Sequence, residues 1–380
     1  MPHRPRSGLA SLAGCLVAIL LTGCASDEGN YLGSGEWAEQ GAPQAPEIPK
    51  PQQPGSPGGG GDTNDPQQDD DGIRATGLDQ PATIAALPDG TALVGERTSG
   101  QVTRVYPVKE KPQEPLYVVP GVDGTTGYGL VAMTPSPQYL ENGLVYAYIT
   151  TATDGRVISL NKAGVPKDIV TGLPKAGAAM TFAPDGSLLV ATGGSDSEFA
   201  GKILTINHWG EPGPAATSGI IMAPGVANPL GLCTDGANVY VVHGGTGAAG
   251  ALTGNALYLV SGESGSSGGI TSAMDPLISY TGESAGAAGC ATTGVEIITA
   301  GTDSQSLATS VLGQDGSVSG APTLSRTGEF GRLRAIALDP INMGLWVGTY
   351  NRDGVGTPAA DDDKVIYIPP PKGGGGGDVS

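Results

Sequence analysis

Residues 75–368 alternate short apolar runs with tight polar turns. Residues 87–90 read Leu-Pro-Asp-Gly and precede the apolar run 91–94, and residues 183–186 read Ala-Pro-Asp-Gly and precede the run 187–190. An Asp-Gly pair between two apolar runs is typical of a β-hairpin, because glycine adopts the positive φ that such turns require. Each copy therefore predicts a strand, a turn and a second strand.

The strand–turn–strand unit recurs along the chain. Clear copies also lie at 233–236 and 338–340, and looser ones at 137–148 and 294–300. The turns at 87–90 and 183–186 enclose one looser copy, which gives a period of roughly 48 residues and six units. Such a period predicts an all-β fold, a six-bladed β-propeller. A double-sheet sandwich is the alternative, but its turns would be closer together.

The amino-acid composition indicates where the propeller begins and ends along the chain. The chain holds 64 Gly and only 3 Phe, which suits many short strands between turns. Residues 24–74 are rich in Gly, Pro, Gln and Asp and lack apolar periodicity, so they predict a disordered linker. Residues 369–380 predict a disordered Gly-rich tail in the same way.

The N-terminus has the features of an export signal. Arg4 and Arg6 precede an apolar run, 9–21, which is too short to span a bilayer and ends in Leu-Thr-Gly before Cys24. This pattern predicts a bacterial lipoprotein: residues 1–23 are removed and Cys24 is acylated. The protein would then be lipid-anchored at the extracytoplasmic face of the cell membrane, with the bilayer as its partner. The alternative is an ordinary secreted protein.

The net charge excludes one class of partner, and the cysteine content bears on the redox state of the protein. The chain has 37 Asp and Glu against 19 Lys and Arg, a net charge of −18, which argues against binding nucleic acid. Cys233 and Cys290 are the two cysteines outside the N-terminal region. In an oxidising compartment they form either a disulfide or a pair of small buried thiols.

The order and spacing of several segments resemble the PQQ-dependent glucose/sorbosone dehydrogenases. The segments that carry the resemblance are 77–97, 129–146, 181–186, 201–204, 228–244, 331–334 and 351–362. The resemblance spans nearly all of 75–368 and implies a six-bladed propeller with PQQ and Ca²⁺ as cofactors. It also implies oxidation of a sugar C1 hydroxyl by hydride transfer to PQQ, with a histidine as the base.

Several positions of the family's site are replaced in this chain. Lys175 stands at the position of the catalytic histidine, and Ala179 replaces the arginine that follows it. A lysine serves as a base only if burial lowers its pKa by several units, and a charged surface lysine is the simpler interpretation. Ala227 replaces a second arginine, although the adjacent Asn228 is kept and remains a candidate catalytic residue with Lys175.

The residues expected to hold calcium and part of the PQQ site are also replaced. Gly127 and the pair Leu252 and Thr253 stand where the family has polar and acidic groups, and Asp303 falls where a basic residue is expected. No metal site is therefore predicted. Asp361, Asp362 and Asp363 form a run of carboxylates that is expected to be solvated.

Arg332 and Arg334 are kept at the positions where the family binds a PQQ carboxylate. Because alternate residues of a strand point the same way, the two predict one anion-binding clamp. The alternative is that they pair with neighbouring acids such as Glu329. His243 aligns near the pocket mouth, and His208 is the other histidine outside the N-terminal region. A lone histidine is more often packed or exposed without a functional role, and this interpretation applies to both.

Three functions follow from these residues. The favoured hypothesis is a non-catalytic propeller that binds a ligand, a sugar or a cell-envelope partner. An active PQQ-dependent aldose sugar dehydrogenase is the alternative, supported by Arg332 and Arg334. A third is a wall-associated or complex-assembly lipoprotein that uses the propeller rim as a docking face.

Overall fold

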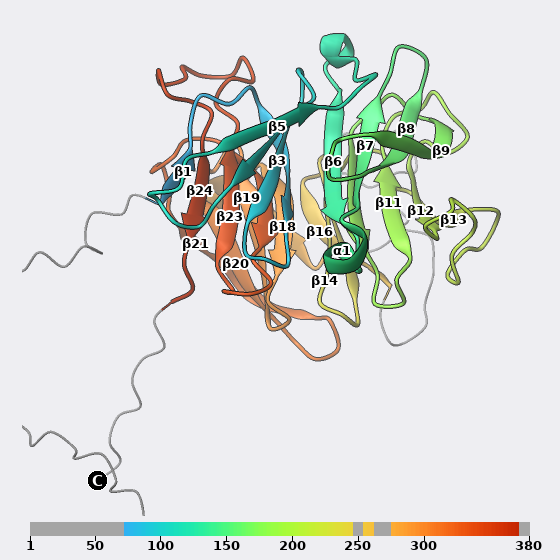
Figure 1. Ribbon diagram of the computed structural model, residues 1–380. Helices are drawn as coiled ribbons and strands as arrows, with labels where there is room; N and C mark the ends of the chain where they lie inside the picture. Colours follow the sequence, from blue (N-terminus) through green and yellow to red (C-terminus); the bar gives the residue numbers. More distant parts are fainter. Residues whose placement is uncertain (1–71, 246–253, 262–274, 372–380) are drawn as a thin grey trace, which may run out of the picture. The chain divides into compact units, whose positions relative to one another are not determined.

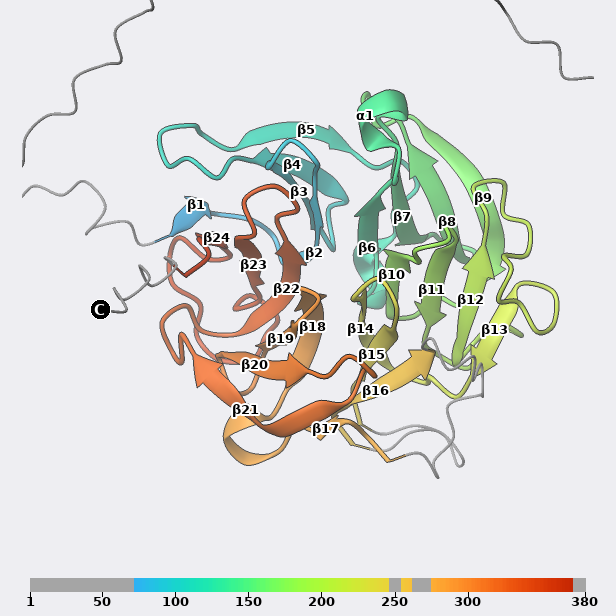
Figure 2. The ribbon, with the colours of Figure 1, turned by 90° about the horizontal axis from the view of Figure 1, so that it is seen from below.

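The computed structural model describes residues 72–245, 254–261 and 275–371. Six four-stranded antiparallel sheets are arranged around a central axis (Figures 1 and 2). The all-β fold and the six-bladed propeller are therefore confirmed. The signal, Cys24, most of the predicted linker, and Leu252 with Thr253 lie outside the described residues. Within the described part, none of the helices has the length and apolar character needed to span a bilayer.

Each of the first five blades is a run of four consecutive strands, numbered from the axis outward. Blade 1 comprises β2 (Pro81–Ala86), β3 (Ala92–Glu96), β4 (Gln101–Val105) and β5 (Glu114–Val118). Blade 2 comprises β6 (Leu130–Pro135), β7 (Val145–Thr150), β8 (Gly155–Leu160) and β9 (Pro166–Leu173). Blade 3 comprises β10 (Ala178–Phe182), β11 (Leu188–Thr192), β12 (Lys202–Ile206) and β13 (Ile221–Pro224).

Blades 4 and 5 follow the same order. Blade 4 comprises β14 (Pro229–Thr234), β15 (Val239–His243), β16 (Ala256–Ser261) and β17 (Ile278–Ser279). Blade 5 comprises β18 (Ala287–Thr292), β19 (Glu296–Gly301), β20 (Leu307–Leu312) and β21 (Val318–Ser325). The helical segments of the described residues are short: η1 (Gly124–Thr126), α1 (Tyr139–Asn142) and η2 (Gly282–Ser284).

Blade 6 closes the ring with strands from both ends of the domain. It comprises β22 (Leu333–Leu338), β23 (Leu345–Thr349), β24 (Val365–Ile368) and, outermost, β1 (Ile73–Ala75). β1 pairs with β24 through Ile73 opposite Ile366 and Ala75 opposite Val365. The predicted end of the linker at residue 74 was therefore wrong, because Ile73 and Arg74 already belong to this ladder.

The predicted Asp-Gly turns join the first and second strands of their blades. In the first of them the Thr91 backbone N–H donates to the Asp89 carboxylate at 3.0 Å, and Gly90 has a φ of +80°. In blade 3 the Ser187 N–H donates to Asp185 at 2.8 Å in the same way. All such turns lie at one end of the propeller, which we call the lower face. The innermost strands begin at the opposite, upper face.

Apolar side chains pack mainly between neighbouring blades. One buried cluster joins blades 1 and 2, and another joins blades 3 and 4. The indole of Trp346 is fully buried on β23, where it meets the Tyr367 ring of β24 at 4.7 Å between centroids. Because the outer faces of the sheets are covered by their neighbours, the ring rather than the single blade is the unit that buries apolar surface.

A β-bulge occurs at the same place in five of the six innermost strands. One residue of the strand is skipped in the pairing with the second strand of the blade, near the upper face. The skipped residues are Ala82, Val131, Leu230, Ala288 and Arg334. A bulge turns the side chain of the extra residue out of the regular alternation, so Arg334 occupies a position that holds an apolar side chain in the other four blades.

A disulfide links the innermost strands of blades 4 and 5. The sulfurs of Cys233 on β14 and Cys290 on β18 are 2.12 Å apart, with their Cα atoms separated by 5.9 Å. Both residues are buried. The bond therefore joins two blades covalently next to the axis of the propeller.

Candidate functional site

The axis of the propeller is a narrow channel that an apolar ring divides in two. Each innermost strand contributes one side chain to this ring: Ile84, Met133, Met180, Leu232, Cys290 and Ile336. The cavity on the upper side is about 90 Å³, and the cavity on the lower side is about 240 Å³. Both are smaller than typical small-molecule pockets, which span roughly 300–1,000 Å³. The upper cavity therefore lies between the apolar ring and the upper face.

Arg334 is the charged residue of the upper cavity. The other described residues that line it are apolar or uncharged, and most are alanine, glycine or aliphatic. The bulge in β22 directs Arg334 into this cavity, because it breaks the alternation between Leu333 and Ala335. The cavity therefore combines small apolar walls with one guanidinium.

The Arg334 guanidinium has no hydrogen bond or ion pair with any described residue. Its carbon lies 4.7 Å from the centroid of the Tyr350 ring, and the Arg97 guanidinium carbon lies 5.2 Å from the same centroid. Burial lowers the pKa of Arg334, as does the positive charge of Arg97, while Tyr350 and the Asp353 carboxylate oppose this shift. Two cations therefore share one aromatic ring, and neither forms an ion pair with an acid among the described residues.

Arg332 is engaged in ion pairs on the other side of Leu333. It donates to the Asp353 carboxylate through Nε at 3.0 Å and through a terminal nitrogen at 2.9 Å, and it donates to Asp303 at 3.2 Å. The two arginines thus do not form the single clamp predicted from strand alternation, because Arg332 precedes β22 and Arg334 lies in its bulge. The alternative, ion pairing with neighbouring acids, holds for Arg332, although its partners are Asp303 and Asp353 and Glu329 pairs instead with Arg326.

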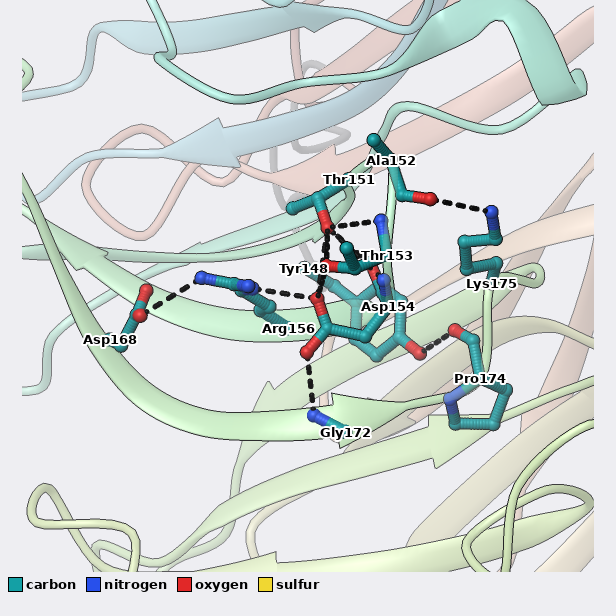
Figure 3. A network of polar contacts seen from close by, with 10 residues as sticks. All are labelled: Tyr148, Thr151, Ala152, Thr153, Asp154, Arg156, Asp168, Gly172, Pro174 and Lys175. Atoms are coloured by element: carbon teal, nitrogen blue, oxygen red, sulfur yellow. Dashed lines mark hydrogen bonds and ion pairs between the residues drawn. The ribbon is translucent and has the colours of Figure 1, made fainter.

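Lys175 lies in the loop between β9 and β10, beside a network of polar contacts (Figure 3). Its ammonium donates to the carbonyl of Ala152 at 3.1 Å. Its backbone N–H donates to the Asp196 carboxylate at 3.4 Å. Both polar groups of Lys175 are therefore engaged in local hydrogen bonds.

Asp154 is the centre of that network and fixes the neighbouring loop. Its carboxylate accepts from Arg156 Nε at 2.8 Å, from the Gly172 N–H at 2.8 Å and from the Thr151 hydroxyl at 2.9 Å. Burial opposes ionisation, but these hydrogen bonds outweigh it and lower the pKa of Asp154 to about 2. Arg156 also pairs with Asp168 at 3.0 Å. Every charged group of this network has a partner.

Asn228 and His243 hold each other in blade 4. The Asn228 side chain donates to the Gly244 carbonyl at 2.9 Å, and its backbone N–H donates to His243 Nε2 at 3.3 Å. His243 Nδ1 lies 3.4 Å from the Gly254 carbonyl, which requires the neutral tautomer with its proton on Nδ1. Burial lowers the pKa of His243. Both residues are committed to local hydrogen bonds.

The donors for a metal ion are sparse. No group of three or more His, Cys, Asp or Glu side chains that could hold a metal occurs among residues 72–245, 254–261 and 275–371. The expectation that the acidic run is solvated was wrong for two of its members, because Asp362 and Asp363 are 4 % and 0 % exposed. Asp363 accepts from the Thr349 hydroxyl and the Asn351 N–H. Its buried carboxylate supports the loop instead of facing the channel.

Sequence reasoning missed Arg97 and Tyr350. Arg97 lies in the segment 77–97 that supports the resemblance, but no pattern linked it to a site. Tyr350 follows β23 directly and is 4 % exposed. Only the closure of the ring brings blade 1 and blade 6 together, so no local periodicity could have joined these two residues.

Comparisons with known proteins agree with this architecture. Residues 78–237 match the family model described as Glucose / Sorbosone dehydrogenase. No curated protein matches the chain. The PQQ-bound aldose sugar dehydrogenase of Streptomyces coelicolor is 27% identical with a TM-score of 0.68, over 78% of this chain and 96% of that chain.

Two further solved structures extend the comparison. A putative oxidoreductase (glucose dehydrogenase) of Thermus thermophilus is 26% identical with a TM-score of 0.63, over 78% of this chain and 98% of that chain. The apo soluble aldose sugar dehydrogenase of Escherichia coli is 14% identical with a TM-score of 0.56, over 78% and 99% of the two chains, and shows the fold alone. The resemblance drawn from the sequence is confirmed.

Proposed function

We propose that this propeller, which is related to the PQQ-dependent sugar dehydrogenases, is a non-catalytic module that binds an acidic small molecule at the upper mouth of its channel. The observation that carries the proposal is the unpaired Arg334 guanidinium in a cavity with no other charged lining residue among those described. A carboxylate is the natural partner of such a group, because charge-assisted hydrogen bonds are strongest away from water. An acidic sugar of the cell envelope has this chemistry.

The local contacts of the candidate base residues support the non-catalytic part of the proposal. Oxidation of a sugar hydroxyl requires a group that accepts its proton at working pH. Lys175 donates to the Ala152 carbonyl, the Asn228 amide donates to Gly244, and His243 Nε2 already accepts from Asn228. Each of these three groups is thus engaged in a local contact.

The residues present fit PQQ in part. Arg334 could hold one carboxylate of the cofactor, which supplies a hydride acceptor when bound. Arg332 is neutralised by Asp303 and Asp353, and the described residues lack a cluster of carboxylates for calcium. Because the fit covers only the anion contact, no redox step is derived for this chain.

The alternative function is an active PQQ-dependent aldose sugar dehydrogenase. Two observations favour it: Arg334 is kept at the family's carboxylate-binding position, and the Streptomyces coelicolor relative is a PQQ-bound aldose sugar dehydrogenase. In this reading Lys175 would have to leave Ala152 and lose its proton. That change needs burial of the ammonium, and Lys175 is only half-buried.

The proposal also includes the cellular location of the protein. The lipobox ending at Cys24 supports an acylated N-terminus and an extracytoplasmic, membrane-anchored protein. Because the chain is acidic, it would not be attracted to anionic lipids by charge, so the acyl chains would provide the anchoring. Incorporation of labelled palmitate, expected for the wild type and not for Cys24→Ala, tests this part. Equal labelling of the two proteins would contradict it.

The test of function is a titration of the full-length protein in detergent. PQQ with Ca²⁺ is followed by absorbance, and dye reduction is then measured with a panel of aldoses. We expect either saturable PQQ binding that Arg334→Gln weakens, or no PQQ binding, and in both cases no sugar-dependent dye reduction. The control Lys111→Gln removes an exposed cation of blade 1 and should change nothing. Sugar-dependent dye reduction would establish the alternative.

A further inference from the structure

The lower face of the propeller carries two neighbouring cavities that the function proposed above does not use. The interblade cavity, of about 580 Å³, lies between blades 2 and 3, which are adjacent in the ring (Figure 2). The mouth cavity, of about 390 Å³, lies where the channel opens beside blades 3, 4 and 5. Phe182, the last residue of β10, lines both cavities, so we call them together the lower groove. Both have the size of cavities that bind small molecules.

The charge of the lower groove selects against anions. No lysine or arginine is among the described residues that line it. Its two carboxylates belong to Asp185 and Asp235, and each accepts a backbone N–H of its own turn at 2.8 Å. The second carboxylate oxygen of Asp185 forms no hydrogen bond with a described residue. The groove therefore differs in its electrostatics from the upper cavity, which contains a guanidinium.

Two buried hydroxyls of the interblade cavity lack partners. Tyr146 is 3 % exposed and meets the Phe182 ring edge-on, at 5.3 Å between centroids, and burial raises the pKa of its hydroxyl. Ser187 is 4 % exposed. Both residues line the cavity, and neither hydroxyl forms a hydrogen bond with a described residue. Because buried polar groups are normally satisfied, these hydroxyls indicate a partner that enters the cavity.

An exposed indole lies beside the same cavity. Trp209 is 61 % exposed, and its ring lies 4.5 Å from the ring of His208, which lines the cavity. The Asn207 side chain accepts from the Trp209 backbone N–H at 2.8 Å, and the Lys167 ammonium lies 4.8 Å from the indole centroid. These contacts fix the ring without covering it. A large aromatic ring held in solvent next to a cavity is typical of a surface that a ligand covers.

The mouth cavity continues the polar chemistry of the groove. The Thr234 hydroxyl accepts from the Gly236 N–H at 3.1 Å, and the Thr292 hydroxyl accepts from the Gly294 N–H at 2.9 Å. Each hydroxyl keeps its own proton for a further hydrogen bond. A ligand that extends past Phe182 would therefore meet more hydroxyls, which favours a chain of polar units over a single one.

A sugar has the chemistry that these groups require. The faces of a sugar ring present C–H groups, which pack on aromatic side chains, and its edge presents hydroxyls, which both donate and accept hydrogen bonds. The second oxygen of Asp185 requires a donor, whereas the Tyr146 and Ser187 hydroxyls take a donor or an acceptor. A proline-rich peptide also packs on aromatic rings, but proline lacks the N–H that Asp185 would accept.

We propose that the lower groove binds a neutral oligosaccharide, whose rings pack on Phe182 and Trp209 and whose hydroxyls bond to Tyr146, Asp185 and Ser187. This site goes beyond the proposed function. It lies on the other side of the apolar ring from the upper cavity and shares no lining residue with it.

The experiment measures oligosaccharide binding to the full-length protein in a zwitterionic detergent, so that no sugar headgroup competes. Calorimetry and tryptophan fluorescence follow titrations with maltohexaose, with tetra-N-acetylchitotetraose and with a decaproline peptide. We expect saturable binding of at least one oligosaccharide and no binding of the peptide. Trp209→Ala should weaken the binding roughly 10-fold through the lost ring contact. Tyr146→Phe should weaken it roughly 3- to 10-fold, because one hydrogen bond is lost.

The control variants separate binding from folding. Tyr128→Ala removes an exposed ring from the loop before β6, at the upper face, and should leave the affinity unchanged. Tyr146→Phe should not lower the melting temperature, because its hydroxyl makes no hydrogen bond within the described fold. Arg334→Gln should bind the oligosaccharide like the wild type, so this site and the proposed function can fail independently.

Four results would overturn the proposal. They are the absence of saturable binding to both oligosaccharides, unchanged affinity in Trp209→Ala, an equal loss of affinity in Tyr128→Ala, and loss of oligosaccharide binding in Arg334→Gln. The last result would assign the oligosaccharide to the upper mouth. Binding of decaproline that depends on Trp209, without binding of either oligosaccharide, would assign the groove to a peptide instead.

Discussion

The two sides of the upper face differ in how their charges are paired. On the side of blade 2, Asp154, Arg156 and Asp168 form a closed set of ion pairs, and Lys175 donates to a backbone carbonyl. Where blade 6 meets blade 1, Arg97 and Arg334 have no acidic partner among the described residues. The paired side includes Lys175, which the resemblance suggested as a candidate base.

This difference distinguishes charged groups that stabilise the fold from charged groups that are available to bind a ligand. A fully paired network lowers the free energy of the folded state, and it leaves no group free for a ligand. Unpaired buried cations raise that free energy, and the cost is recovered when an anion binds. The charged groups beside Lys175 are therefore committed to local contacts, whereas the Arg334 guanidinium forms no hydrogen bond with a described residue.

The largest expected effect comes from replacing Asp154 in the ion-paired network of blade 2. We expect Asp154→Asn to lower the free energy of unfolding by about 1–3 kcal/mol, because Arg156 and the Gly172 N–H lose a charged acceptor. Urea unfolding at neutral pH measures this change. Asp168→Asn is the matched control: it removes the other, half-exposed partner of Arg156 and should cost less than about 0.5 kcal/mol.

The same substitution has a defined dependence on pH. The pKa of Asp154 is about 2 in the folded protein and about 4 in the unfolded chain, so its contribution is complete above pH 4 and disappears as the pH falls towards 2. The difference in stability between wild type and Asp154→Asn should therefore be smaller at pH 3 than at pH 6. A difference that grows on acidification, or a change in anion binding, would contradict this assignment.

A smaller change of opposite sign in the free energy of unfolding is expected when Arg334 is replaced. Arg334→Met replaces a cation by an apolar side chain of similar length in a cavity with apolar walls. We expect it to raise the free energy of unfolding by about 0.5–1 kcal/mol and to abolish anion binding. Arg326→Met, which removes an exposed and paired arginine, is the control and should do neither. A destabilised Arg334→Met protein would mean that Arg334 supports the fold.

The fold could be predicted from the sequence because its signal is local and repeated. Each turn of this repeat specifies one hairpin, and four clear and two looser copies specify the ring. The site could be predicted only where it follows the strands: Arg334 was found by resemblance, but the bulge that separates it from Arg332 has no sequence signature. Arg97 and Tyr350 meet through closure of the ring, which is a long-range contact that no local pattern encodes.

The closure of blade 6 by β1 also determines how the molecule responds to force. A pull applied through the residues before Gly72 acts first on β1, a strand of three residues whose ladder with β24 joins Ile73 to Ile366 and Ala75 to Val365. So short a ladder is the weakest mechanical element on this path. Its release would leave β24 as the exposed edge of a three-stranded blade 6, while β22 stays packed against β2 and keeps the ring closed. Tension on the N-terminal segment would therefore expose an unpaired strand edge before it disturbs the channel.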